Sequence, residues 1–229
     1  MNAPKKIGIL GGTFDPPHLG HLKLASHFAK VLRLDELLLI PSGEPWQKGM
    51  DITPAKIRFQ LTQAAAIDVA KAFLDLQIST QIGVDRMEMD RAGPSYTIDT
   101  VQALRERFGP QTSLTWLMGA DSLIQLPTWD SWKELFKYVN LAVASRPHFD
   151  LATQMSPEIE ELLRTHQIND PAALENSPAG LIYIDKSLSI DLSSTELRNH
   201  LKTSSRGQIA SEQIPAHTLE IITKLGLYQ

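Results

Sequence analysis

The residues with the clearest chemical potential are two histidines near the N-terminus, His18 and His21, which lie three positions apart in the stretch GGTFDPPHLGHL. A neutral imidazole can donate a hydrogen bond to a phosphate oxygen, and a protonated one adds charge attraction. Two imidazoles at this spacing therefore suit a site that holds a phosphate on which negative charge develops. Two other interpretations stay open at this point. One is a metal site, for which no third ligand lies nearby in the sequence, and the other is an ordinary turn with two histidines at a helix start.

The residues around the histidines predict a site for an anion. The apolar run KIGIL at residues 6–10 is typical of a buried strand, and it ends at Gly11 and Gly12, where the backbone can approach a ligand closely. A helix is expected from Gly20, because apolar residues recur from there at spacings of three and four. The first N–H groups of a helix have no partner within it, and its dipole is positive at that end. A strand joined to a helix through glycines is therefore suited to bind a phosphate.

Strands and helices are expected to alternate along the chain. Helices are expected from Gly20 and over residues 97–108, and another is expected where Thr53 would be the N-cap and Pro54 the first helical residue. Continuous apolar runs indicate strands buried on both faces, as in a mostly parallel sheet. The pattern predicts a single α/β domain with a Rossmann-like, doubly wound sheet and helices on both faces. The expected strands are residues 6–10, 36–40, 113–118, 140–145 and 180–184.

The expected fold also predicts where a ligand binds. In doubly wound sheets ligands lie outside the carboxyl ends of the strands, where the strand order reverses. The stretch after residue 10 leaves the first strand at that end, so its position favours a site there. Within a single domain spanning residues 1–229, residues 149–179 are acidic and poor in apolar side chains, and we expect an insertion or surface excursion. Residues 192–229 are expected to form a C-terminal helical portion.

Composition narrows the class of protein. The chain has 229 residues, of which 42% are hydrophobic and 21% charged, which is typical of a globular protein. No apolar run reaches the roughly 18 residues that a membrane helix needs, and no signal peptide is predicted. The absence of cysteine excludes disulfides and thiolate metal ligands. These features predict a cytoplasmic protein with no membrane partner.

The charge of the chain bears on its partners. A net charge of -4 disfavours nucleic acid, because broad binding to a phosphate backbone needs a basic face. The same charge is compatible with a small anionic ligand, since a local cluster of donors can hold a phosphate on an acidic protein. Small-molecule partners are therefore expected, and no oligomeric state is predicted.

The segment GTFDPPHLGH closely resembles the signature of the HxGH nucleotidyltransferases, which are relatives of the class I aminoacyl-tRNA synthetases. The HxGH motif is His18-Leu19-Gly20-His21 in this chain. The resemblance implies that the loop binds the triphosphate of ATP and that both histidines act in catalysis by stabilising the α-phosphate in the transition state. The loop residues that it implies at the ATP site are Gly11, Gly12, Thr13, Phe14, His18, Gly20 and His21.

A second motif of this superfamily is expected before a late helix, and LSSTELR at residues 192–198 resembles it. Taken by itself, the segment reads as an ordinary capping box, with Ser193 three residues before Glu196. The two interpretations are compatible, because a capped helix start is also an anion site. The resemblance implies that the β- and γ-phosphates contact Ser194, Thr195 and the catalytic Arg198, and that Asp121 lies near the ATP ribose.

Three further segments resemble the bacterial nicotinate-nucleotide adenylyltransferases within this superfamily. They are PSGEPWQK at 41–48, EMDRAGPSYTIDT at 88–100 and GADSLIQLPTW at 119–129. One departure lies in the first segment, where Trp46-Gln47 replaces the Pro-His that is usual in the family.

The same resemblance implies a site for the acceptor. Trp129 would stack on the pyridine ring, for which a flat aromatic side chain is physically suited. The backbone around Thr97 would help to hold the nicotinate carboxylate. The other residues implied at this acceptor site are Ser42, Lys48, Ser95, Tyr96 and Asp130.

The reaction that the resemblance implies is adenylyl transfer from ATP to nicotinate mononucleotide, giving deamido-NAD and pyrophosphate. Mg²⁺ would be carried mainly by the ATP phosphates and water, with no metal ligands from the protein. The nearest alternatives keep the chemistry and change the acceptor, to nicotinamide mononucleotide or phosphopantetheine, or change the donor to CTP. An alternative of another class is a non-catalytic nucleotide-binding regulator with the same fold.

Overall fold

The computed structural model describes residues 4–47, 49, 52–145, 154–188, 194–202 and 212–228. Within residues 194–202, side chains are described for Ser194, Leu197, Arg198, Asn199 and Leu201. In this described part of the chain, no helix combines the length and the apolar character that a membrane span requires.

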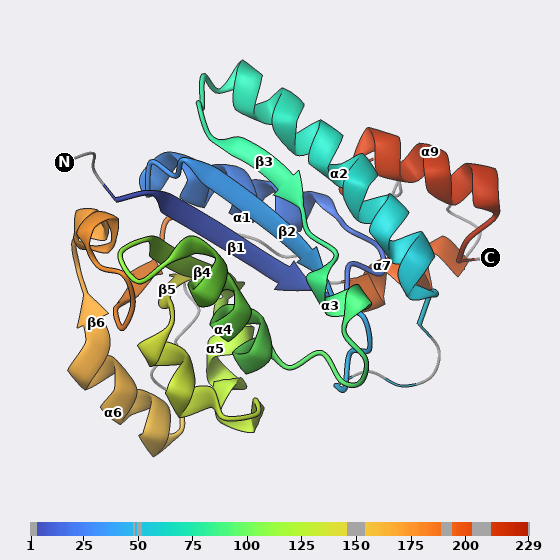
Figure 1. Ribbon diagram of the computed structural model, residues 1–229. Coiled ribbons are helices and arrows are strands. Elements are labelled where there is room, and N and C mark those ends of the chain that lie inside the picture. Colours follow the sequence, from blue (N-terminus) through green and yellow to red (C-terminus); the bar gives the residue numbers. More distant parts are fainter. Residues whose placement is uncertain are drawn as a thin grey trace.

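Seven strands form one sheet in the order β3-β2-β1-β4-β5-β7-β6, and every neighbouring pair is parallel (Figure 1). All five predicted strands are present, within two residues of their expected bounds. Two short strands, β3 and β6, were not predicted from the sequence, because four and two residues are too few for a periodic signal. The strands are β1 Lys6–Gly12, β2 Glu36–Pro41, β3 Gln81–Val84, β4 Ser113–Gly119, β5 Asn140–Ala144, β6 Gln167–Ile168 and β7 Ile182–Asp185.

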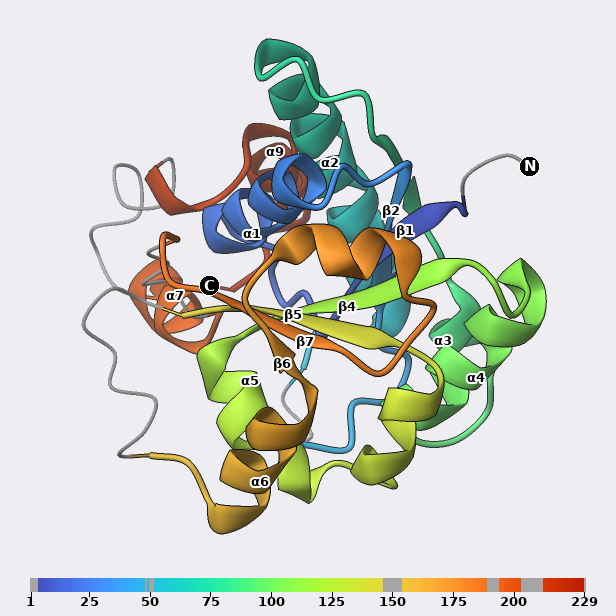
Figure 2. The same ribbon diagram turned by 90° about the vertical axis from the view of Figure 1, so that its left-hand side faces the viewer.

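Helices cover both faces of the sheet, as predicted (Figure 2). The described helices are α1 Leu19–Val31, α2 Ala55–Asp75, α3 Met87–Asp90, α4 Thr97–Phe108, α5 Ala120–Ile124, α6 Pro157–His166, α7 Ser194–Lys202 and α9 Ala216–Leu225. Short 3₁₀ turns are η1 Leu126–Thr128, η2 Trp132–Lys137 and η4 Pro171–Asn176. The predicted helix over residues 97–108 is confirmed at both ends.

Alternate residues of a buried strand belong to two separate apolar clusters, one on each face of the sheet. In β2, Leu38 and Ile40 pack with the α4 side, whereas Leu37 and Leu39 pack with the α1 side. Because both faces are covered, all residues of β2 after Glu36 are buried, and this explains the continuous apolar run in the sequence. A third cluster, centred on Leu61, joins α2 to α7 and α9.

The start of α2 differs from the prediction. Pro54 is the N-cap rather than the first helical residue, with φ -50° and ψ 140°, and the helix begins at Ala55. Proline disfavours helical backbone in the residue before it, so Thr53 lies outside the helix and does not cap it. The Thr53 hydroxyl instead donates to the Tyr228 hydroxyl over 3.3 Å.

The expectation of a surface excursion at residues 149–179 is corrected for the part that the structure describes, residues 154–179. Ile159, Leu162 and Leu163 are buried in the main apolar cluster, and β6 extends the edge of the sheet. The apolar residues of this segment are few, but their spacing places them on one face of α6. Residues 149–153 lie outside the described part of the chain.

Gly43, directly after the loop residue Ser42, provides a test of the packing around β2. A Cβ atom on Gly43 would lie 2.3 Å from the carbonyl oxygen of Glu88, which is backbone and cannot swing aside. We therefore expect Gly43→Ala to separate this loop from α3 and to lower the free energy of unfolding by about 1–3 kcal/mol. Gly49→Ala is the control, because a Cβ atom there would have no neighbour within 4 Å among the described residues. Equal melting temperatures for the two variants would contradict this packing.

Candidate functional site

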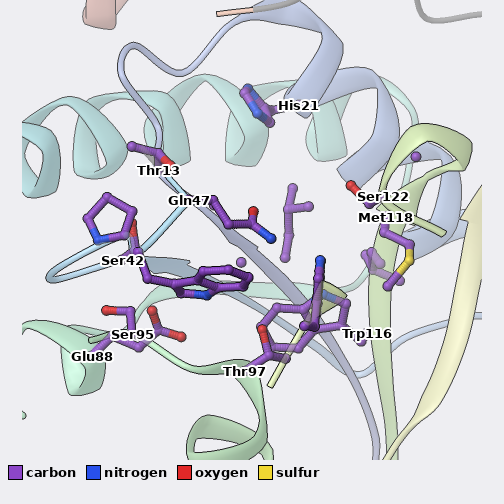
Figure 3. A pocket seen from close by; sticks show the side chains of 18 of the residues that line it. Thr13, His21, Ser42, Gln47, Glu88, Ser95, Thr97, Trp116, Met118 and Ser122 are labelled. Carbon is purple, nitrogen blue, oxygen red and sulfur yellow. The ribbon is translucent and has the colours of Figure 1, made fainter. Parts of the chain in front are cut away.

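A cavity of about 260 Å³ opens at the carboxyl ends of β1 and β4 (Figure 3). The strand order reverses between these two strands, so the cavity lies where the sequence predicts a ligand site. Figure 3 shows His21 at one end of the cavity and Glu88, Ser95 and Thr97 at the other. The predicted site residues that line it are Gly11, Gly12, Thr13, His21, Ser42, Ser95, Thr97, Trp129 and Asp130.

Several predicted residues lie beside the cavity rather than in its wall. Phe14 is buried among apolar residues, with its ring edge-on to His21 at 5.0 Å between centroids. Tyr96 lies near Trp46, with 6.1 Å between the ring centroids. Asp121 is exposed at the start of α5, next to the cavity residue Ser122. The roles predicted for these side chains stay predictions.

The two histidines form one unit at the start of α1. His18 is the N-cap, and its backbone N–H donates to Nδ1 of His21 over 3.1 Å. The two rings stack with 3.7 Å between their centroids. Since Nδ1 of His21 accepts a hydrogen bond, the ring proton of the neutral form is assigned to Nε2, which then remains a donor. Nδ1 of His18 is buried with no hydrogen-bond partner among the described residues.

Burial keeps both imidazoles neutral in this structure. It lowers the pKa of His18 to about 4, against the opposing effect of a backbone hydrogen bond. It also lowers the pKa of His21 well below its usual range, with a further contribution from the neighbouring charge of protonated His18. The histidines are therefore preorganised as neutral hydrogen-bond donors, and an anion bound beside them would raise both pKa values.

The late helix α7 lies against the loop that precedes the histidines. The Ser194 hydroxyl donates to the Pro16 carbonyl over 3.1 Å, and Nη1 of Arg198 donates to the Asp15 carbonyl over 2.6 Å. The structure thus brings together the two predicted motifs from opposite ends of the sequence. Of the other residues of the second motif, Ser193 and the side chain of Thr195 lie outside the described part of the chain.

Arg58 is a site residue that sequence reasoning missed. Its guanidinium is fully buried and donates to four backbone carbonyls, those of Thr13, Ser42, Gly43 and Thr53, at distances of 2.6–2.8 Å. These bonds join the loops after β1 and β2 to the segment before α2. A signal exists in the sequence, because Arg58 occupies a position on the apolar face of α2, three residues before the buried Leu61.

Arg58 is also electrostatically coupled to the loop after β1. Burial lowers the pKa of its guanidinium, and the negative charge of Asp15 opposes that shift. A buried guanidinium that donates mainly to neutral carbonyls is stabilised in its charged form by such a nearby negative charge. Among the charges that oppose the effect of burial on Arg58, that of Asp15 is the largest.

Two serines, Ser95 and Ser42, help to organise the cavity wall. Oγ of Ser95 accepts hydrogen bonds from the N–H groups of Gly43 and Glu44, at 2.9 and 3.1 Å. The Ser42 N–H donates to the Gly12 carbonyl over 2.9 Å, which ties the β2 loop to the end of β1. Two predicted acceptor-site residues thus shape the cavity wall through backbone contacts.

Glu88 is a second residue that sequence reasoning missed. It lines the cavity, is nearly fully buried, and accepts a hydrogen bond of 2.7 Å from the Thr100 hydroxyl. Burial raises the pKa of its carboxyl group, and the hydrogen bond from Thr100 opposes that shift. Sequence spacing alone places Glu88 in a polar stretch, so its burial depends on the packing of α3 against β2.

Trp46-Gln47, which replaces the Pro-His that is usual in the family, lies in the cavity wall. Trp46 and Gln47 both line the cavity, and Trp46 remains 43% exposed there. Lys48, which the resemblance places at the acceptor site, lies outside the described part of the chain. Across the described ranges, no group of three or more histidine, aspartate or glutamate side chains could hold a metal ion.

The buried histidine pair has a spectroscopic consequence. Between about pH 8 and about pH 5.5 we expect no protonation of His18 or His21 in the free protein, because their lowered pKa values lie below this window. The partly exposed His217 is the internal control, since its hydrogen bond to Asp68 raises its pKa above the ordinary 6.5. NMR titration of the imidazole resonances checks this. A midpoint near neutrality for His18 and His21 would contradict the buried, neutral pair.

The sequence and the fold match known proteins. Residues 9–200 match the model of a family described as cytidylyltransferase-like. A relative from Aeromonas salmonicida (strain A449), named "Probable nicotinate-nucleotide adenylyltransferase", is 39% identical over 229 residues, or 100% of this chain and 99% of the relative. A relative of the same name from Herminiimonas arsenicoxydans is 36% identical over 227 residues, or 97% of this chain and 96% of the relative.

A solved structure shares the fold. Plasmodium falciparum nicotinic acid mononucleotide adenylyltransferase complexed with NaAD superposes with a TM-score of 0.69 at 17% identity, covering 98% of this chain and 97% of that one. The resemblance stated from the motifs is confirmed by the full-length sequence matches. The chain belongs to the cytidylyltransferase-like family and to the nicotinate-nucleotide adenylyltransferases.

Proposed function

We propose that this chain transfers the adenylyl group of ATP to nicotinate mononucleotide, forming deamido-NAD and releasing pyrophosphate. The observation that carries the proposal is the stacked pair His18 and His21 at the start of α1, beside the loop on which Arg198 rests. The relatives' shared name, nicotinate-nucleotide adenylyltransferase, supports the choice of donor and acceptor. Two structural neighbours, complexed with NaAD and with APC, add support for a nucleotide ligand.

The chemistry requires little from the protein beyond positioning and charge. An oxygen of the mononucleotide phosphate attacks the α-phosphorus of ATP, and the bond from the α-phosphorus to the β-bridging oxygen breaks. The electron pair leaves with pyrophosphate. Because the nucleophile is already an anion, neither a general base nor a covalent intermediate is needed. The protein must instead hold two negatively charged phosphates together in line.

The residues at the histidine end of the cavity suit that task. The neutral imidazoles donate hydrogen bonds without the reorganisation that water would need, and such preorganised donors act on charge as it develops in the transition state. The N–H groups at the start of α1 and the Arg198 guanidinium add positive potential. We assign catalysis to His18, His21 and Arg198 on this basis.

The proposal includes Mg²⁺ bound mainly through the ATP phosphates and water, where it would neutralise phosphate charge. The donor set suits this arrangement, because the described residues near the loop offer imidazoles and backbone groups rather than a cage of carboxylates. We place the protein in the cytoplasm on the strength of its composition and its lack of cysteine.

The opposite end of the cavity is proposed to receive the acceptor. Trp129 and Thr97 lie in its wall together with Ser95, and Asp130 follows Trp129 there. An indole can stack on a pyridine ring, and backbone N–H groups near Thr97 can receive a carboxylate. A site built for the carboxylate should reject the corresponding amide strongly, because its donors would be left mismatched.

The first kinetic prediction concerns His18. We expect His18→Ala to reduce kcat by about 10² to 10³, because one preorganised donor to the developing charge is lost. Pyrophosphate release is the measurement, and circular dichroism checks that the variant is folded. His217→Ala is the control, since this histidine lies on α9 and is paired with Asp68 outside the cavity. Turnover near the wild-type rate in folded His18→Ala would remove His18 from the mechanism.

The second kinetic prediction concerns the acceptor. With ATP and Mg²⁺ present, we expect strong preference for nicotinate mononucleotide over nicotinamide mononucleotide. Trp129→Ala should raise KM for the acceptor about tenfold, because the stacking surface is removed. Trp132→Ala is the matched control, since Trp132 packs against the main apolar cluster and does not line this cavity. Equal use of both mononucleotides would overturn the acceptor assignment and leave the chemistry in place.

A further inference from the structure

Asp15 receives contacts from three distant segments of the chain. Its side chain is 1% exposed, in the loop between β1 and α1. Oδ1 accepts a hydrogen bond of 2.6 Å from the Tyr228 hydroxyl, and Oδ2 accepts one of 3.2 Å from the Thr53 N–H. Arg198 donates to the Asp15 carbonyl and lies 3.9 Å from Oδ2. Asp15 does not line the cavity, so any influence on the reaction passes through its neighbours.

The last turn of the chain is built to bring Tyr228 back to this loop. After α9, Gly226 caps the helix with φ 60°, and the Leu227 N–H donates to the Ile222 carbonyl over 3.0 Å. Tyr228 itself has φ 61°, in the left-handed region that a tyrosine rarely adopts. Leu227 and Tyr228 pack against the cluster around Leu61. Apolar contact therefore anchors the turn, and the hydroxyl is the part that reaches the loop.

The Tyr228 hydroxyl both accepts and donates a hydrogen bond in this position. It accepts a hydrogen bond from the Thr53 hydroxyl and donates its own proton to Asp15. Burial raises the pKa of the phenol, and the hydrogen bond to Asp15 raises it further. The phenol consequently stays protonated at neutral pH and remains a donor. A donor to a buried carboxylate is among the stronger hydrogen bonds in proteins.

We propose that Tyr228 is a positioning residue for adenylyl transfer. Its hydroxyl fixes the Asp15 carboxylate, and with it the loop that presents His18 and the carbonyl on which Arg198 rests. The C-terminal turn thereby supports both phosphate-binding motifs from outside the cavity. This inference rests on the proposed function, because its effect is measured as kcat and KM of adenylyl transfer.

The test uses Tyr228→Phe in the full chain, which removes the hydroxyl and retains the ring. We expect kcat to fall about tenfold and KM for ATP to rise, while KM for the acceptor stays within about twofold. Tyr138→Phe is the matched control, because its hydroxyl accepts a hydrogen bond of 3.3 Å from Gln102, outside the cavity wall. A residue that serves only stability would lower the melting temperature without this split between the kinetic constants. Wild-type kcat and KM in Tyr228→Phe would overturn the proposal.

A double-mutant cycle with Asp15→Asn shows whether Tyr228 acts through Asp15. If it does, the double variant should be no slower than Asp15→Asn alone, and additive losses would overturn the proposed route. Should Asp15→Asn fail to fold, the kinetic split in Tyr228→Phe still decides the proposal.

A separate readout distinguishes this inference from the proposed function. If the wild-type protein releases no pyrophosphate with nicotinate mononucleotide, the proposed function fails, and the rise in melting temperature caused by ATP is measured instead. We then expect a smaller rise in Tyr228→Phe than in the wild type and in Tyr138→Phe. Equal rises in all three proteins would overturn the positioning role.

Discussion

The arrangement of the site depends on one buried cation, the guanidinium of Arg58. Carbonyls of the loops after β1 and β2 and of the segment before α2 are directed at this guanidinium, and a carbonyl shielded from water costs free energy if left unpaired. Arg58 satisfies four of these carbonyls at once, with hydrogen bonds of 2.6–2.8 Å. Burial disfavours the charge of the guanidinium, and the negative charge of Asp15 opposes that effect. The loops after the first two strands are thus held as one body.

This constraint explains the state of the histidines. The loop between β1 and α1 is fixed by the Arg58 hydrogen bond to the Thr13 carbonyl, so it can keep His18 and His21 stacked and buried. Burial disfavours the charged forms of both imidazoles. The result is a pair of neutral donors whose orientation is set before any ligand arrives. Neutral, fixed donors are well suited to a phosphate, since they cost little desolvation when the site is empty and gain interaction as charge develops.

The two ends of the cavity are built on different principles. At the histidine end, donors come from a helix start and from side chains on distant segments. At the end with Ser95 and Glu88, hydroxyl and backbone groups shape the wall (Figure 3). Trp46 and Trp129 add aromatic surface to the cavity lining. The division matches the needs of a charged phosphate chain on one side and a flat heterocycle on the other. The reversal of strand order between β1 and β4 is what places the two ends in one cavity.

The sequence by itself determined the elements and the local chemistry. Apolar runs predicted five strands and periodicity predicted the helix at 97–108, because these signals act over a few residues. The spacing of His18 and His21 suited a phosphate site but left a metal site and an ordinary turn open. Tertiary structure alone decided which groups compensate one another: Asp15 accepts a hydrogen bond from the distant Tyr228, and its negative charge acts on the buried Arg58. It also decided the burial of Glu88 and the core role of α6. The physical reason is that a buried charge selects its partner by distance in space, which local sequence patterns do not encode.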